Sequence, residues 1–187
     1  RQIPISVPLA HIFNLSITTG IFPTKLKISR TVPIYKGGDR EQCDNYRPIS
    51  LLSTLSKILE KMVAIQLINH LELNNLLYHH QYGFQPKKST EHNLTHLANY
   101  VYNALNEKKY CIGLFLDLKK AFDVCSHKIL LKKLKKYGIL GITHAWFESY
   151  LTDRVQKVDI NGQISSEKLF NISVIQGSIL GPILFLI

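Results

Sequence analysis

Gly113-Leu-Phe-Leu-Asp117-Leu-Lys-Lys-Ala-Phe122-Asp123 places one acidic side chain at the end of an otherwise apolar run and follows it with two lysines and an aromatic residue. Such a run predicts a buried strand whose tip has a chemical role. Because a carboxylate there is unfavourable without a cation, a bound divalent ion is the natural partner of Asp117, and oxygen ligands favour magnesium. The alternative is an acid that meets solvent or caps the next helix. For one isolated aspartate, that alternative is the better interpretation.

Three further segments favour a metal-binding role for Asp117 over that alternative. They are Tyr46-Arg-Pro-Ile-Ser-Leu-Leu52, Gln81-Tyr-Gly-Phe-Gln-Pro-Lys-Lys-Ser-Thr90 and Gln176-Gly-Ser-Ile-Leu-Gly-Pro182. Taken in order with the acidic segment, they resemble the reverse transcriptase domain of non-LTR (LINE-type, jockey-like) retrotransposons, from about Phe22 to the last residue. The resemblance implies an α+β, right-hand polymerase fold and RNA-directed DNA polymerase activity.

The resemblance also divides the chain into two subregions of one domain. Residues 1–110 are expected to form a fingers subdomain, and residues 111–187 an incomplete palm. Arg1 is not an initiator residue, and Ile187 lies within an apolar run. We therefore expect a fragment of a longer polyprotein, truncated at both ends.

Composition is compatible with this interpretation. The 187 residues are 45% hydrophobic, which excludes a disordered tail. A formal charge of +10 favours a polyanionic partner, either nucleic acid or an anionic membrane surface. Membrane insertion is disfavoured because Pro4, Pro8, His11 and Asn14 interrupt the apolar stretch from Ile3 to Ile21. No secretory signal is evident.

The cysteines and histidines indicate no metal site or disulfide framework. Cys43, Cys111 and Cys125 are odd in number and contain no C-x-x-C pair. A reducing, intracellular location fits best, in the nucleus and/or the cytoplasm. His92 and His96 have the spacing of metal ligands on one helix face, but no third ligand is nearby, so we interpret them as surface histidines.

The first half of the chain predicts a hairpin followed by two helices. Ile28–Tyr35 is expected to be a strand that turns and pairs with Tyr46–Leu52. A helix begins near Ser53, and a second opens at Ser89-Thr90-Glu91. Two apolar stripes are expected to face the core, formed by Leu55, Ile58, Leu59, Met62, Val63, Leu67 and Leu71 in the first helix and by Leu94, Leu97, Val101 and Leu105 in the second.

The second half predicts a strand from about Tyr110 to Asp117, then a helix over Ser126–Tyr137. A shorter helix is expected around residues 144–151, and then a hairpin from Arg154 to Val174 with a tight turn at Asn161-Gly162. In the helix over Ser126–Tyr137 the expected inward side chains are Ile129, Leu130, Leu134 and Tyr137. Its lysines either contact a nucleic-acid backbone or form a solvated face, and the pattern does not decide between the two.

The chemistry implied by the resemblance explains the acid. Joining a primer 3′ hydroxyl to a nucleoside triphosphate requires an activated oxygen, a neutralised pyrophosphate and in-line geometry, which two Mg²⁺ ions about 4 Å apart supply. By resemblance, Asp117 is the catalytic metal ligand, and the backbone carbonyl of Leu118 is an additional ligand. The partner acids are expected as an adjacent Asp-Asp pair beyond Ile187. Asp123 is expected instead to cap the following helix or fix the turn.

The resemblance assigns five residues to the incoming nucleotide. Lys36 and Arg47 stand where the family places a basic pair for the triphosphate. Phe122 matches the aromatic residue that excludes a ribose 2′ hydroxyl by steric clash. Gln176 and Gly177 resemble the loop that packs against the nascent base pair. The alternatives are surface charges for the two basic residues and a core phenylalanine for Phe122.

Lys87 and Lys88 resemble residues that contact the template, and a plain basic loop is the alternative for them. The expected partners are therefore an RNA template, a DNA primer and deoxynucleoside triphosphates, with no membrane. A competing hypothesis is a catalytically dead remnant that binds RNA through its basic surface. A phosphatase with Asp117 as nucleophile is weaker, because position 119 is a lysine where a second acid is normally required.

The interpretation has two consequences that can be checked. The 187-residue chain is expected to be inactive alone, because one metal-binding carboxylate cannot organise two ions. The interpretation also requires Asp117 to lie near the cleft that Arg47 and Gln176 share.

Overall fold

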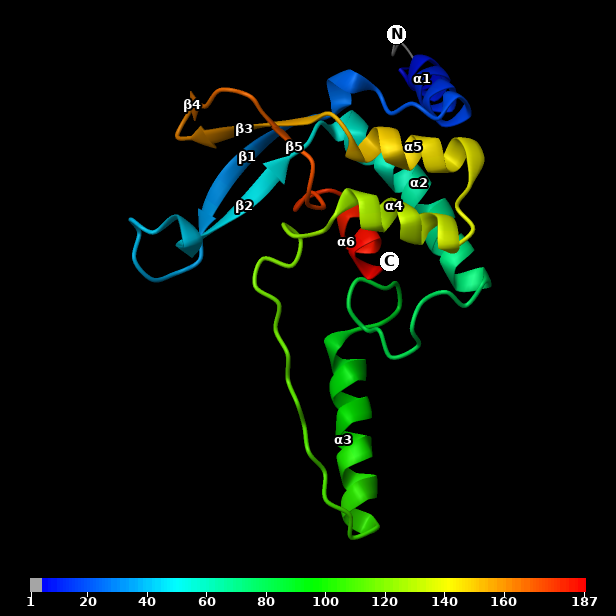
Figure 1. Cartoon of the computed structure of the whole chain (residues 1–187), viewed down its shortest axis with the longest axis vertical. Coiled ribbons are helices and arrows are strands. Elements are labelled where there is room, and N and C mark those ends of the chain that lie inside the picture. Colours follow the sequence, from blue (N-terminus) through cyan, green and yellow to red (C-terminus); the bar gives the residue numbers. More distant parts are fainter. Residues whose placement is uncertain (1–4) are drawn as a thin grey trace.

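In the computed structural model of this chain, residues 5–187 are described. Arg1 to Pro4, which include the start of the apolar stretch from Ile3, lie outside the described residues. The described chain is a mixed α/β structure in which a twisted sheet lies beside a group of helices (Figure 1). One long helix and the segment that follows it extend away from this body (Figure 1).

The sheet joins strands from both halves of the chain. Strand β1 (Ile28–Tyr35) pairs antiparallel with β2 (Tyr46–Leu51) and parallel with β3 (Arg154–Ile160). The short strands β4 (Gln163–Ile164) and β5 (Lys168–Phe170) both pair antiparallel with β3. The predicted first hairpin is therefore confirmed, with Tyr35 opposite Tyr46, and the order along the main path is β2-β1-β3-β4.

The predicted tight turn at Asn161-Gly162 is also confirmed. Ile160 pairs with Gln163, so the loop between β3 and β4 has these two residues alone. Both have positive φ, at 51° and 88°, as the tight turns that match the twist of the strands require. The carboxylate of Asp159 accepts a hydrogen bond from the Gly162 amide at 2.8 Å.

Five helices form the body beside the sheet (Figure 1). They are α1 (Ser6–Thr19), α2 (Thr54–Leu73), α4 (His127–Lys136), α5 (Gly141–Leu151) and α6 (Leu180–Leu186). An aromatic group ties α5 to the chain before β1, because the Phe22 ring lies 5.4 Å from Trp146 and 5.1 Å from Tyr150. Within the described residues, no helix is long and apolar enough to cross a membrane.

The predicted apolar stripes are confirmed only where other elements cover them. In α2, the side chains of Leu59, Leu67 and Leu71 are buried, whereas Ile58 and Met62 are exposed. In α4, Leu130 and Leu134 are buried as predicted, and Tyr137, which caps the helix, is partly buried. The prediction was wrong for Ile129, which is 59% exposed because it lies on the side of α4 turned away from the core.

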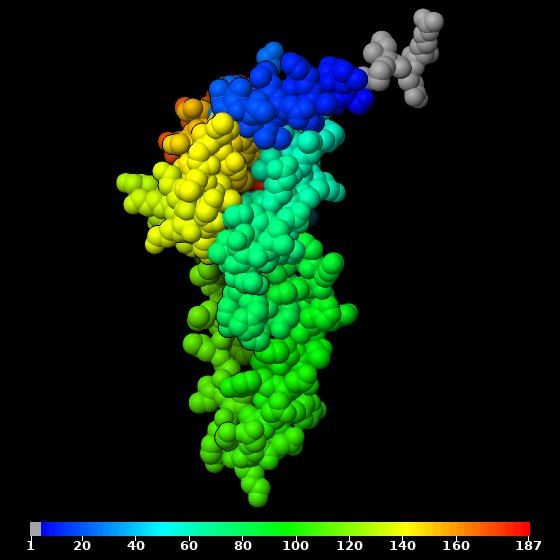
Figure 2. Space-filling model, turned by 90° about the vertical axis from the view of Figure 1, so that its right-hand side faces the viewer, coloured from blue at the N-terminus to red at the C-terminus, as the bar shows by residue number. Residues whose placement is uncertain are grey.

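Helix α3 (Thr90–Asn106) begins where the sequence predicts it, but its buried face does not exist in this structure. The Ser89 side chain accepts a hydrogen bond from the His92 amide, and the His92 ring accepts one from the Ser89 amide. No residue of α3 is buried, and Leu94 and Leu105 are more than 60% exposed. Figure 2 shows α3 and its neighbouring segment projecting beyond the body. The prediction of an inward face was wrong because no described element packs there.

The predicted strand from Tyr110 to Asp117 is wrong for the same reason. This segment forms no ladder with any strand of the described residues and runs as extended chain beside α3 (Figure 1). Phe115 and Leu116 are 83% and 84% exposed. An apolar run becomes a buried strand only when a neighbour supplies backbone hydrogen bonds and covers its side chains, and no described segment does so here.

Candidate active site

The motif segments converge at a small cavity beside the sheet. Its volume is about 250 Å³, and it is lined by Thr31, Pro48, Ser50, Asp123, Gln156, Phe170, Ser173, Val174, Ile175 and Gln176. Three of the four motif segments, residues 46–52, 113–123 and 176–182, contribute to this lining.

The loop that carries Gln176 and Gly177 lies directly against β2. The Ser50 amide donates to the Gln176 carbonyl oxygen at 2.8 Å. Gly177 has φ of 109°, and a Cβ at this position would lie 2.5 Å from the Ser50 carbonyl oxygen. Both the backbone conformation and the close approach therefore require glycine. The resemblance predicted a close backbone approach at Gly177, and its partner in this structure is the strand β2.

The segment after Asp117 runs beside the segment before Gln176. The Phe122 carbonyl oxygen accepts a hydrogen bond from the Val174 amide at 2.9 Å, and the Cys125 carbonyl oxygen accepts one from the Ser173 amide at 2.9 Å. These contacts bring Asp123 to the cavity. Asp123 does not act as the N-cap of α4, a position that Ser126 occupies, and its amide closes a turn to the Lys120 carbonyl oxygen at 2.8 Å.

The Phe122 ring is packed between two aromatic side chains. It stacks on Phe185 with ring centroids 4.9 Å apart and meets Phe84 edge-on at 5.9 Å. Phe84 belongs to the Gln81–Thr90 motif, and Phe185 belongs to α6. The structure therefore joins the acidic segment to a second motif segment through apolar contact.

Two lysines beside Asp117 reach the corner that precedes β2. Lys120 donates to the Asp44 carboxylate at 2.8 Å, and the Lys119 ammonium lies 3.7 Å from the same group. Asp44 lies in the 3-10 turn Cys43–Asn45. The hydrogen bond from Lys120, followed by the charges of both lysines, lowers the pKa of the Asp44 carboxyl group, and the same hydrogen bond raises the pKa of Lys120.

Lys36 and Arg47 flank this corner. The Lys36 amide donates to the Asn45 carbonyl oxygen at 3.0 Å, and both basic side chains are exposed. Arg47 lies between Tyr46 and Pro48 on β2, so its side chain leaves the face of the strand opposite to theirs. Arg47 does not line the cavity, although Pro48 does.

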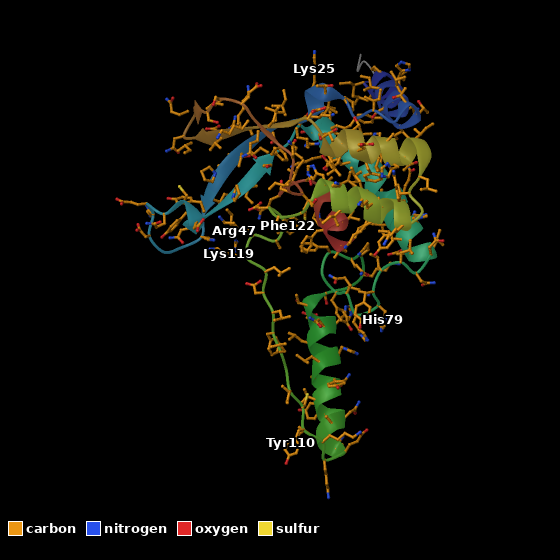
Figure 3. All side chains as sticks on the ribbon, viewed as in Figure 1. Lys25, Arg47, His79, Tyr110, Lys119 and Phe122 are labelled. Atoms are coloured by element: carbon orange, nitrogen blue, oxygen red, sulfur yellow. The ribbon has the colours of Figure 1, made fainter. Side chains whose placement is uncertain are left out.

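Asp117 and Leu118 are exposed in the extended segment. Asp117 forms no hydrogen bond or ion pair with another predicted site residue among the described residues. Figure 3 shows Arg47, Lys119 and Phe122 in one region of the view, with Tyr110 at the far end of the projection. Asp117 therefore lies two residues from the Lys119 contact and outside the lining of the cavity. Because Arg47 also lies outside this lining, the described residues do not form the expected cleft shared by Arg47 and Gln176 with Asp117 beside it.

The two predicted template lysines differ in their surroundings. Lys87 is exposed and has φ of 62°. The Lys88 ammonium donates to the carbonyl oxygens of His79 and Gln81 at 2.7 and 3.0 Å, and lies 5.5 Å from the centroid of the Tyr82 ring. Lys88 therefore closes its own loop, whereas the Lys87 side chain faces solvent.

Several residues near the site were missed from the sequence. Asp44 was missed because its partners lie far along the chain. Glu60 and Arg154 are charged but fully buried, and both lie in segments that read as ordinary amphipathic elements. The only signal for Glu60 was its position among the apolar residues of α2.

No metal-binding group is complete among residues 5–187. No set of three or more histidine, cysteine, aspartate or glutamate side chains in this part of the chain has a geometry that could hold a metal ion. Cys43, Cys111 and Cys125 are free thiols in this structure, and burial raises the pKa of Cys125.

A comparison with protein families identifies the class. The model described as "Reverse transcriptase (RNA-dependent DNA polymerase)" matches residues 34–187, which run from the end of β1 through α6. The chain belongs to the reverse transcriptase family. The matched region contains every motif segment from which the resemblance was argued.

Within that family, the chain is similar in sequence to enzymes of mobile elements. The chain is 35% identical over 184 residues to the "Probable RNA-directed DNA polymerase from transposon BS" of Drosophila melanogaster, covering 95% of this chain and 20% of the relative. It is 34% identical over 178 residues to the "RNA-directed DNA polymerase from mobile element jockey" of the same organism, covering 95% of this chain and 19% of that protein.

A more distant relative is the "Retrovirus-related Pol polyprotein from type-1 retrotransposable element R2" of Popillia japonica. It is 30% identical over 173 residues, which are 92% of this chain and 24% of the relative. The chain spans about a fifth of the length of these relatives. The predicted reverse transcriptase domain of non-LTR retrotransposons is thereby confirmed.

Proposed function

We propose that the polypeptide to which this chain belongs is an RNA-directed DNA polymerase that copies the transcript of a non-LTR retrotransposon. Its substrates are deoxynucleoside triphosphates, an RNA template and a DNA primer. The proposal rests on the family membership and on the names of the relatives, which are RNA-directed DNA polymerases of mobile elements. The fold we propose is the right-hand polymerase fold, with fingers over residues 1–110 and palm from residue 111 onward.

The observation that carries the proposal is the convergence of the motif segments on one cavity. Ser50 is hydrogen-bonded to Gln176, and Phe122 is hydrogen-bonded to Val174. Asp123 and Gln176 line the same cavity of about 250 Å³. A non-catalytic remnant would need none of these contacts to bind RNA through basic side chains. For that reason, and because the relatives are polymerases, we do not favour the remnant.

The roles of individual residues belong to the same proposal. Lys36 and Arg47 would bind the triphosphate, and Gln176 and Gly177 would contact the nascent base pair. Phe122 would exclude a ribose 2′ hydroxyl, a role supported by its rigid packing against Phe84 and Phe185. Lys87 and Lys88 would contact the template. Lys87 is the better placed of the two, because the Lys88 ammonium is already held by two carbonyl oxygens.

Magnesium does not fit the described residues by themselves. Asp117 and the carbonyl of Leu118 offer one carboxylate and one backbone oxygen, and no third acidic group accompanies them in this part of the chain. We propose that the remaining ligands come from the parent polypeptide, of which the chain covers about a fifth if the parent has the length of the relatives. The location we propose is intracellular, in the nucleus and/or the cytoplasm.

The test is primer extension by the parent polypeptide on an RNA template with deoxynucleoside triphosphates. Asp117→Asn keeps the size of the side chain and removes the charge. The loss of rate should exceed the 10–100-fold that is typical for residues around a metal ligand. Asp153→Asn is the matched control, because it makes the same change at an exposed aspartate outside the lining of the cavity and is expected to retain most of the activity.

Three outcomes would contradict the proposal. They are no template-dependent extension by the wild-type parent, an equal loss of activity in the two variants, and an unchanged rate in Asp117→Asn. Extension by the isolated 187-residue chain, abolished by Asp117→Asn, would overturn the expectation that the chain is inactive alone.

A further inference from the structure

Helix α2 carries a fully buried carboxylate that the proposed chemistry does not use. Glu60 has 0% of its surface exposed. A buried carboxylate is strongly unfavourable unless hydrogen bonds or a cation compensate for the lost water. The surroundings of Glu60 therefore have to be arranged around its charge.

Three donors satisfy the Glu60 carboxylate. The Ser56 hydroxyl, one turn earlier in α2, donates to Oε1 at 2.9 Å. The other oxygen, Oε2, accepts the backbone amides of Ile179 and Leu180 at 2.9 and 3.3 Å. These two amides come directly after the Gln176–Ser178 loop, so the carboxylate holds the end of that loop where α6 begins.

A buried cation, Arg154, acts on this carboxylate through its charge, but no hydrogen bond or ion pair joins the two among the described residues. Arg154, at the start of β3, has 0% exposure and donates to the Tyr150 carbonyl oxygen at 2.9 Å. Its guanidinium carbon lies 4.7 Å from the centre of the Tyr150 ring. Burial lowers the pKa of Arg154, and the charge of Glu60 acts in the opposite direction. Burial and the Glu60 charge together raise the pKa of Tyr150.

The other end of the loop is held by β2. The Ser50 amide binds the Gln176 carbonyl oxygen at 2.8 Å, and Gly177 packs against the Ser50 carbonyl oxygen with no room for a side chain. Within the loop, the Ser178 hydroxyl donates to the Ile175 carbonyl oxygen and accepts the Gly181 amide, both at 2.8 Å. The loop that carries Gln176 is thus held at one end by Ser50 of β2 and at the other end by Glu60 of α2.

We propose that Glu60 is a positioning residue that fixes the Gln176–Gly177 loop at the distance from β2 that the incoming nucleotide requires. Glu60 does not line the cavity of about 250 Å³, whereas Gln176 does, so Glu60 acts through the loop. The expected effect of Glu60 on nucleotide incorporation rests on the proposed polymerase function. Its effect on the loop can be measured whether or not the protein is a polymerase.

Substitutions at this position should act in a graded order. In Glu60→Gln, the side-chain oxygen can still accept the two amides if its NH₂ group turns toward Ser56, but the negative charge is lost. In Glu60→Ala, the amides of Ile179 and Leu180 lose their acceptor. The loop should therefore be loosened slightly by Gln and strongly by Ala.

The first measurement is amide hydrogen exchange on the isolated chain. Glu60→Ala should accelerate exchange at Ile179 and Leu180 by about 10-fold or more, as expected when buried donors lose their acceptor. Ser56→Ala is the matched control, because it removes one hydrogen bond to Glu60 and leaves both amide contacts in place. Glu60→Gln covers the case in which the alanine variant does not fold. Unchanged protection of the loop amides in both Glu60 variants would overturn the inference.

The second measurement is steady-state primer extension by the parent polypeptide. Glu60→Ala should raise KM for the deoxynucleoside triphosphate by about 10-fold and Glu60→Gln should raise it less, with kcat changed much less in both, because the group that binds the nucleotide moves while the metal-binding acid stays. Leu71→Ala, on the same helix and fully buried, is the control for general loss of stability and should leave KM near the wild-type value.

The outcomes separate the inference from the function on which it depends. A wild-type parent that incorporates no nucleotide contradicts the proposed function, and the exchange experiment then still decides the role of Glu60 in the loop. An active parent in which Glu60→Ala and Leu71→Ala raise KM equally contradicts the positioning role.

Discussion

At the scale of the residue, the site depends on one position without a side chain. Gly177 combines φ of 109° with a backbone approach that leaves 2.5 Å between a Cβ and the Ser50 carbonyl oxygen. An L-residue there is strained by its backbone conformation and also displaces the loop from β2. These two effects can be separated, because Gly162 also has positive φ, at 88°, but has open space around it.

We expect Gly177→Ala to lower the free energy of unfolding by more than Gly162→Ala does. Backbone strain alone is worth about 1–3 kcal/mol at such positions and is common to both variants, whereas the contact with Ser50 exists only at Gly177. Urea unfolding of the 187-residue chain measures the difference. Equal losses would show that the close approach to β2 does not contribute.

His127 makes the stability of the chain dependent on pH. It is 7% exposed, and its Nε2 lies 2.7 Å from the Ser173 carbonyl oxygen, to which it donates. Burial lowers the pKa of His127 below the ordinary value of 6.5. The unfolded chain therefore takes up a proton at a higher pH than the folded chain. The stabilisation is complete above pH 6.5 and is lost as the pH falls from 6.5 through the folded-state pKa.

We expect the free energy of unfolding to fall between about pH 7.5 and pH 5.5, and to fall less in His127→Gln. Glutamine can still donate to the Ser173 carbonyl oxygen but does not titrate in this range. Urea unfolding at the two pH values measures the difference. His11→Gln is the control, because this histidine is exposed on α1 and forms no side-chain hydrogen bond among the described residues. The same slope in wild type and His127→Gln would exclude this histidine as the cause.

At the scale of the element, ion pairs with Asp44 join the corner before β2 to the segment after Asp117. Lys120 lies 2.8 Å and Lys119 lies 3.7 Å from the Asp44 carboxylate. All three groups are exposed, so the contact should hold the segment in place without adding much to overall stability. The contact requires an ionised carboxylate, so it is present above the ordinary Asp pKa of 3.8 and is lost as the pH falls through the lowered folded-state value.

Carbon NMR of the Asp44 carboxyl group during a pH titration tests this contact. The midpoint should lie below 3.8 in the wild type and return toward 3.8 in Lys120→Ala. Lys119→Ala should change it less, because the Lys119 ammonium is farther from the carboxylate and contributes only its charge. High salt should raise the wild-type midpoint in the same direction. A midpoint that does not respond to Lys120→Ala would show that the two elements are not joined there.

The elements that the sequence predicted well are those whose pattern and partners are both local. β1 and β2 follow each other in the sequence, joined by residues 36–45, and the Asn161-Gly162 turn determines its own geometry. α3 and the segment from Tyr110 to Asp117 have equally clear apolar patterns. Whether their apolar side chains are buried depends on a neighbouring element, and the pattern carries no information about that neighbour. The same limit applies to the site, because the approach of Gly177 to Ser50 and the attachment of Glu60 to α6 join distant parts of the chain.

At the scale of the whole molecule, the chain consists of a packed body and an uncovered projection. The core residues belong to the helices and strands of the body and to the loops between them, whereas α3 contributes none. Exposed apolar side chains follow one another along the extended segment, from Tyr110 at 101% and Ile112 at 94% to Leu116 at 84%. Contiguous apolar surface of this kind marks a surface that another segment or molecule covers.

We expect trypsin to cleave the isolated chain first within this projection, after Lys108, Lys109, Lys119 or Lys120. Cleavage needs a locally unfolded backbone, and the segment from Lys109 to Leu118 has no ladder to open. Lys57 and Lys61 are the internal control, because they lie on α2 within the packed body and cleavage after them requires that helix to unfold. Mass spectrometry of the early fragments identifies the sites. If the projection is covered in the parent polypeptide, the same four bonds should resist cleavage there, whereas equal cleavage in the chain and the parent would show that its apolar side chains stay exposed to solvent.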